Sequence, residues 1–76
     1  MDYKKFYSEI ADWIMQSNQA AMQYGMDSQE FWQWVMDSLA VICERYGNNS
    51  LVLEQAAMLH KWLNDFYVEG VRRNDN

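Results

Sequence analysis

Few residues of this chain have the type and spacing that a chemical site requires. The chain of 76 residues holds one histidine, His60, and one cysteine, Cys43. Neither has a second histidine or cysteine at metal-ligand spacing, so we expect no metal site. His60 falls at the edge of an apolar helical face and Cys43 falls within one, positions typical of packing residues. We therefore predict a packing role for Cys43 and no chemical role for His60, a boundary residue.

Glu9 and Asp12 are the candidates for paired catalytic carboxylates, because they lie three positions apart in the sequence. They fall on the most polar face of the first expected helix, where no apolar pocket would prepare either group for acid catalysis. No glycine-rich phosphate loop and no Gly-x-Ser-x-Gly elbow occurs in the sequence. We predict that the chain is not an enzyme and needs no cofactor.

A second apolar stripe occupies the back of the middle helix that we expect over residues 28–46. It consists of Trp34 and Val41, and it is flanked by Glu30, Asp37 and Glu44, which repeat every seven residues. A tryptophan is costly to leave in water, so the stripe is either a second core contact or a binding surface. Aromatic anchors bordered by charge are favoured at protein interfaces, and we predict an interface at these five residues.

Two near-identical turns separate the elements that position these residues. Residues 24–28 read Tyr-Gly-Met-Asp-Ser, and residues 46–50 read Tyr-Gly-Asn-Asn-Ser. In each copy the glycine can end a helix in the left-handed conformation, and a side chain such as Asp27 or Asn49 can cap the next helix. Gly70 follows at a similar interval. The repeat reflects either a duplication or repeated turn chemistry.

Apolar residues recur every three or four positions in three segments, about residues 3–24, 28–46 and 51–69. Short linkers make sequential helices antiparallel. We predict an all-α fold, a three-helix antiparallel up-down-up bundle that forms a single domain over residues 1–70 and is followed by a polar C-terminal tail at 71–76. The expected core face of the third helix consists of Leu51, Val52, Ala56, Met58, Leu59, Trp62, Leu63, Phe66 and Tyr67.

The apolar content of the chain is high for its length. Hydrophobic residues make up 50% of the sequence and aromatic residues 16%, and each buried aromatic side chain removes about 150 to 250 Å² from water. Since soluble monomers rarely expose large apolar patches, we expect an aromatic core together with an interface. A symmetric homodimer, which brings one patch against its own copy, is the form of oligomer we predict.

Charge and hydropathy limit the classes of partner that we expect for this chain. The net charge of −5 repels phosphate backbones, so we expect no nucleic-acid partner and favour basic partner surfaces. The longest apolar run, residues 39–43, has five residues, whereas a membrane span needs about 20. Met1 precedes charged residues rather than an apolar signal core. We expect a cytoplasmic protein with no membrane contact.

These observations favour one function and leave an alternative open. The first is a small acidic, non-enzymatic protein that self-associates and binds or regulates another protein with a basic or apolar surface. The alternative is an acidic inhibitor that occupies a nucleic-acid-binding site of a host or phage enzyme. Glu30, Asp37 and Glu44 would then mimic phosphates at a spacing of about 10.5 Å along the helix.

Overall fold

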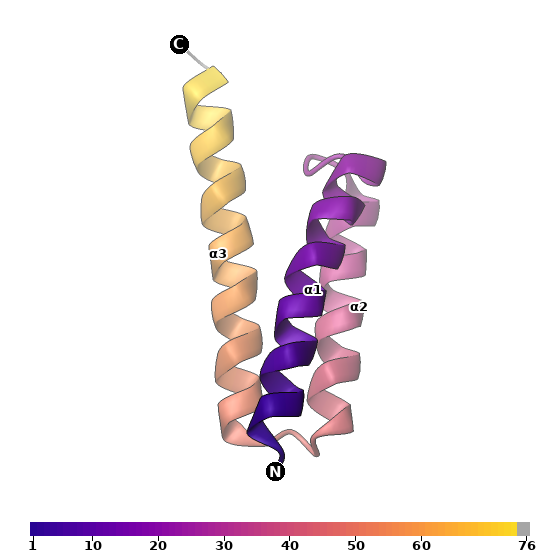
Figure 1. Ribbon diagram of the computed structural model, residues 1–76. Coiled ribbons are helices and arrows are strands. Elements are labelled where there is room, and N and C mark those ends of the chain that lie inside the picture. The colour runs from indigo at the N-terminus through magenta and orange to yellow at the C-terminus, as the bar shows by residue number, and fades with distance from the viewer. Residues whose placement is uncertain (75–76) are drawn as a thin grey trace. The chain divides into compact units, whose positions relative to one another are not determined.

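The structure, a computed structural model, describes the backbone of residues 1–74 and the side chains of residues 1–70. It contains α1 (Tyr3–Tyr24), α2 (Gln29–Arg45) and α3 (Ser50–Asn74) in that order (Figure 1), and no strand within residues 1–74. The predicted all-α class and the three helices are confirmed. The bounds of α1 and α2 agree with the predicted bounds to within one residue at each end.

The chain divides into two compact units, and the division falls within α2. The first unit is Met1–Val35, and the second begins at Met36. The first unit therefore contains α1, the turn after it and the start of α2. The second unit contains the rest of α2, the next turn and α3. Each unit has its own turn and its own buried residues.

The turn of the first unit follows α1 and depends on a glycine. Gly25 has φ 82°, and its N–H donates to the carbonyl of Ala21 at 2.9 Å, which closes the helix end. An L side chain is strained at this φ, so glycine is favoured here, as predicted. The indole N–H of Trp32 donates to the carbonyl of Met26 at 2.7 Å. This bond ties the turn to the first residues of α2.

The turn of the second unit ends α2 with a second glycine. Gly47 has φ 62° and the next residue, Asn48, has φ 57°. The N–H of Gly47 donates to the carbonyl of Glu44 at 3.0 Å, and that of Asn48 donates to Cys43 at 2.9 Å. This pair of bonds is the Schellman motif, in which two residues beyond the helix satisfy its last free carbonyls. The predicted left-handed glycine is confirmed at Gly47, whereas Gly25 has a positive φ with ψ 137°, outside the left-handed helical region.

Side-chain oxygens cap the helices that follow the two turns. The hydroxyl of Ser28 accepts a hydrogen bond from the N–H of Phe31 at 3.2 Å. The side-chain oxygen of Asn49 accepts one from the N–H of Leu51 at 2.9 Å. Asn49 is thus confirmed as a cap of α3. The cap of α2 is Ser28 rather than the predicted Asp27, because α2 begins one residue later than expected.

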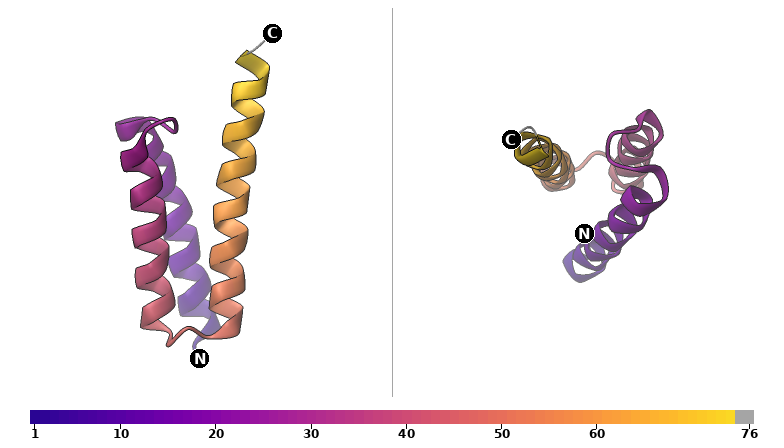
Figure 2. Two further views of the ribbon diagram at one scale, coloured as in Figure 1. Left: turned by 180° about the vertical axis from the view of Figure 1, so that it is seen from behind. Right: turned by 90° about the horizontal axis from the view of Figure 1, so that it is seen from above.

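The end of α3 differs from the prediction. We expected the third helix to stop at residue 69, before Gly70, yet α3 continues to Asn74, and Figure 2 shows it as one unbroken helix. A glycine inside a helix costs only about 1 kcal/mol relative to alanine, and the sequence has no proline that would force an end. Residues 71–74 of the predicted tail thus belong to α3, and residues 75–76 lie outside the described chain.

Each unit buries a set of mostly apolar side chains. One residue of the first unit was not expected in the core: Ser17 is 1% exposed, and its hydroxyl donates to the carbonyl of Ile14 at 2.7 Å. That bond satisfies the buried hydroxyl, so the burial costs little. In the first unit the buried residues are Phe6, Ile10, Trp13, Ser17, Ala20, Phe31 and Val35. In the second they are Leu39, Ile42, Cys43, Val52, Leu59 and Leu63.

Candidate interaction surfaces

Trp34, the predicted aromatic anchor of the interface, is half-buried in the first unit. Its ring stacks on that of Trp13 with centroids 5.5 Å apart and an interplanar angle of 18°. It also lies 6.4 Å from the ring of Phe31 at 27°. Trp13 itself is only 2% exposed. Of the two alternatives that the sequence left open for Trp34, the structure therefore shows a core contact.

These rings form an aromatic cluster that we define as Trp13, Phe31, Trp32 and Trp34. The ring of Trp32 meets Phe31 edge-on at 5.1 Å and 80°. Stacked and edge-to-face pairs contribute about 0.5 to 1.5 kcal/mol each beyond the area they bury. The cluster thus uses much of the apolar surface of Trp34. That Trp34 also takes part in an interface remains a prediction.

The other four residues of the predicted interface are exposed on α2. Val41 is 52% exposed, and Glu30, Asp37 and Glu44 are exposed as well. At 100° per residue these three carboxylates lie within about 40° of one another around the helix axis, with Val41 about 20° beyond Glu30. Glu30 belongs to the first unit and Asp37 and Glu44 to the second; we call these three exposed carboxylates, which share one side of the α2 wheel with Val41, the acidic row.

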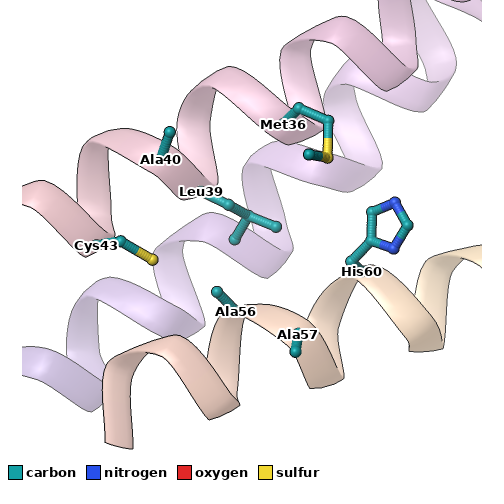
Figure 3. A pocket seen from close by; sticks show the side chains of 7 residues that line it. All are labelled: Met36, Leu39, Ala40, Cys43, Ala56, Ala57 and His60. Atoms are coloured by element: carbon teal, nitrogen blue, oxygen red, sulfur yellow. The ribbon is translucent and has the colours of Figure 1, made fainter. Parts of the chain in front are cut away.

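A groove of about 400 Å³ lies between α2 and α3 in the second unit. We call it the α2–α3 groove. Figure 3 shows Met36 and His60 facing one another toward one end, Cys43 and Ala56 toward the other, and Leu39 between them. The lining residues are Met36, Leu39, Ala40 and Cys43 from α2, and Ala56, Ala57 and His60 from α3.

Small side chains account for this space. Alanines at positions 40, 56 and 57 leave room between the two helices that a larger side chain would fill. Leu39 and Cys43 are buried at its base, whereas Ala40 and Ala57 are exposed at its edges. Sequence reasoning did not identify the groove, because it depends on which residues of two different helices line the same space.

A row of large apolar side chains is exposed on α3. Met58, Trp62 and Phe66, spaced four residues apart, are 48%, 41% and 63% exposed. We call these three residues the apolar row. The prediction that they belong to the core was wrong, because the apolar arc of α3 spans about 180° and its buried residues occupy only about 40° of it. Those buried residues are Val52, Leu59 and Leu63.

His60 and Cys43 lie in the groove rather than in a reactive cluster. Cys43 is a buried free thiol, in agreement with the predicted packing role. His60 is an exposed lining residue. Within the described residues, no group of three or more His, Cys, Asp or Glu side chains is arranged to hold a metal ion. In the same part of the chain, no helix combines the length and apolar character needed to cross a membrane.

Comparison of the chain with known proteins gives no match. No family model, no curated protein and no solved structure matches the chain. A proposal of function therefore has to start from the surfaces themselves: the acidic row on α2, the α2–α3 groove and the apolar row on α3.

Proposed function

We propose that this chain is a small acidic, non-enzymatic helical protein that acts through protein–protein contacts. It self-associates, and it binds or regulates another protein with a basic or apolar surface. The observation that carries the proposal is the apolar row of α3, where Met58, Trp62 and Phe66 are all more than two fifths exposed.

The row has the character of a contact surface. Tryptophan, phenylalanine and methionine are enriched in protein interfaces, and tryptophan is frequent among the residues that dominate binding energy. Spacing of four residues places the three side chains along one side of α3 over about 12 Å. A stripe of this kind can meet its own copy about a two-fold axis, so we propose a symmetric dimer formed through α3.

The proposal also covers the arrangement of the helices and the cellular compartment of the protein. The turns between the helices are short, which favours an antiparallel up-down-up bundle over residues 1–70. The net charge of −5 disfavours nucleic acid and anionic membranes as partners. We propose a cytoplasmic protein, and we assign Val41 and the acidic row to the surface that binds the second protein.

Light scattering on a size-exclusion peak tests self-association. At tens of micromolar we expect a mass about twice the chain mass of 9.1 kDa, and a monomer for Trp62→Gln/Phe66→Gln. The matched control is Met15→Gln/Met22→Gln, since both methionines are exposed on α1, and it should remain dimeric. A monomeric wild-type chain, or a variant of the apolar row that stays dimeric, contradicts the proposed dimer.

The exposed acidic row favours a second candidate function, phosphate mimicry at the nucleic-acid-binding site of another enzyme. Glu30, Asp37 and Glu44 repeat at about 10.5 Å along α2. Under this hypothesis, Glu30→Lys/Glu44→Lys abolishes capture of the partner, and added duplex DNA displaces the partner from the wild-type chain. If DNA displaces nothing and charge reversal leaves capture intact, mimicry is wrong.

A further inference from the structure

The α2–α3 groove and part of the acidic row share one edge. Around α2, Glu44 lies about 40° and Asp37 about 60° from Ala40, which lines the groove. Both carboxylates are exposed. An apolar groove in the second unit is thus bordered along α2 by two negative charges.

On α3, the residues that follow the groove-lining His60 include an ion pair. Lys61 forms an ion pair with Asp65, with Nζ and Oδ2 2.7 Å apart, and both side chains are largely exposed. This pair contributes no net charge. The groove edge formed by α3 itself consists of Ala57 and His60. Asp37 and Glu44 therefore make the α2 edge of the groove acidic, in a chain whose net charge is −5.

The groove has the shape of a trough that is open to solvent. Met36 is 56% exposed at one end, and Ala40 and Ala57 are exposed along the edges. From Met36 to Cys43 the groove follows α2 for about 10.5 Å, roughly two helical turns. A methionine at the mouth can repack around side chains of different shape. An open apolar trough two turns long suits a helix better than an enclosed small molecule.

We infer that the α2–α3 groove binds a basic amphipathic helix of a partner protein. Two or three apolar side chains of that helix, at spacings of three and four, fill the space above Leu39 between Ala40 and Ala57. Lysine or arginine residues flanking them reach Asp37 and Glu44. This inference names the partner surface for the partner-binding half of the proposed function, and it rests on that proposal.

Charge also argues against a second copy of this chain as the occupant. The chain has eleven acidic and six basic residues, so a second copy offers few bases for an acidic groove edge. A helix that enters the groove beside Asp37 and Glu44 needs an excess of bases along one side. No helix of the chain has more bases than acids: α1 has two of each, α2 has one base and three acids, and α3 has three of each.

Fluorescence anisotropy with a defined probe tests the inference. The probe is a labelled synthetic peptide of about five helical turns made of leucine and lysine, with leucine at spacings of three and four. Its controls are a peptide of the same composition in scrambled order and one with glutamate in place of lysine. We expect saturable binding of the first peptide and at least about tenfold weaker binding of both controls.

Matched variants locate the site. Ala57→Phe and Ala40→Met fill the groove at exposed positions, and each should weaken peptide binding by about tenfold or more. Ala11→Phe, at an exposed alanine of α1, should leave binding unchanged. Asp37→Lys/Glu44→Lys should weaken binding further at low salt, whereas Asp12→Lys/Asp27→Lys, which changes the net charge equally, should do so much less. Circular dichroism verifies that each variant is helical.

Each contrary result overturns the inference. Equal binding by the groove-filling variants and the wild-type chain means that the peptide binds elsewhere. Equal binding of the scrambled peptide means that charge alone is recognised. If Ala57→Phe abolishes dimer formation instead, the groove accommodates a second copy. If the peptide binds without specificity while the Trp62-dependent dimer stays intact, the groove is rejected as the peptide site and self-association is retained. Failure of this inference is therefore distinguishable from failure of the proposed dimer.

Discussion

In the first unit Trp13 and Trp34 stack 5.5 Å apart, whereas in the second unit Trp62 is 41% exposed on α3. The alanines differ in the same way. Ala20 of the first unit is 6% exposed, but Ala40 and Ala57 of the second are exposed at the edges of a groove. The comparison teaches that Trp13, Trp34 and Ala20 serve internal packing in the first unit, whereas Trp62, Ala40 and Ala57 of the second are exposed.

The largest expected effect separates the tryptophans of the two units. Trp13→Ala removes a buried ring that is the stacking partner of Trp34, and we expect a loss of about 3 to 5 kcal/mol in the free energy of unfolding. Trp62→Ala should cost less than about 1 kcal/mol when measured at concentrations where the chain is monomeric. Urea denaturation followed by circular dichroism measures both. Equal losses for the two variants would remove the distinction between the units.

Replacing an alanine with the larger leucine should distinguish a filled interior from an open groove. Ala20→Leu inserts atoms at a buried position and should destabilise the fold by about 1 to 3 kcal/mol. Ala57→Leu extends into the groove and should change stability by no more than about 0.5 kcal/mol. Thermal or urea unfolding of the two variants gives the comparison. A severe loss from Ala57→Leu would show that the groove closes in solution.

A smaller effect concerns the two turns. Ser28→Ala removes the hydroxyl that accepts from Phe31, and we expect a loss of about 1 kcal/mol. Asn49→Ala should cost a similar amount at the start of α3. Asp27→Ala should cost less than either, since Asp27 is not the residue that caps α2. If Asp27→Ala is the costliest of the three in urea denaturation, the cap assignment is wrong.

Much of the backbone was predictable because local physics determines it. The periodicity of apolar residues requires a helix that buries one side, and the glycines at 25 and 47 supply the positive φ of the two turns. Gly70 was interpreted as the same signal, although it keeps a helical backbone inside α3. A glycine ends a helix only where the following residues also offer a stop, and the sequence after Gly70 offers none.

The surfaces were harder to predict, because they depend on contacts between helices. A helical wheel gives the direction of Trp34 but not the position of Trp13, whose ring it meets. The wheel of α3 likewise gives an apolar arc without showing how much of it other residues cover, and so Met58, Trp62 and Phe66 were assigned to the core. The groove requires residues of α2 and α3 to line the same space, which a single sequence does not reveal.

The central claim is that the second unit carries the self-association surface while the aromatic cluster of the first unit is internal. Nitrogen-edited NMR of the four tryptophan indole N–H groups tests it in one dilution series, because Trp13, Trp32 and Trp34 report on the first unit and Trp62 on the second. The account predicts that the Trp62 signal shifts with concentration and that the Trp13 signal stays fixed. A Trp62 signal that is independent of concentration while those of Trp34 and Trp13 move would contradict it and favour the interface predicted at Trp34 and Val41.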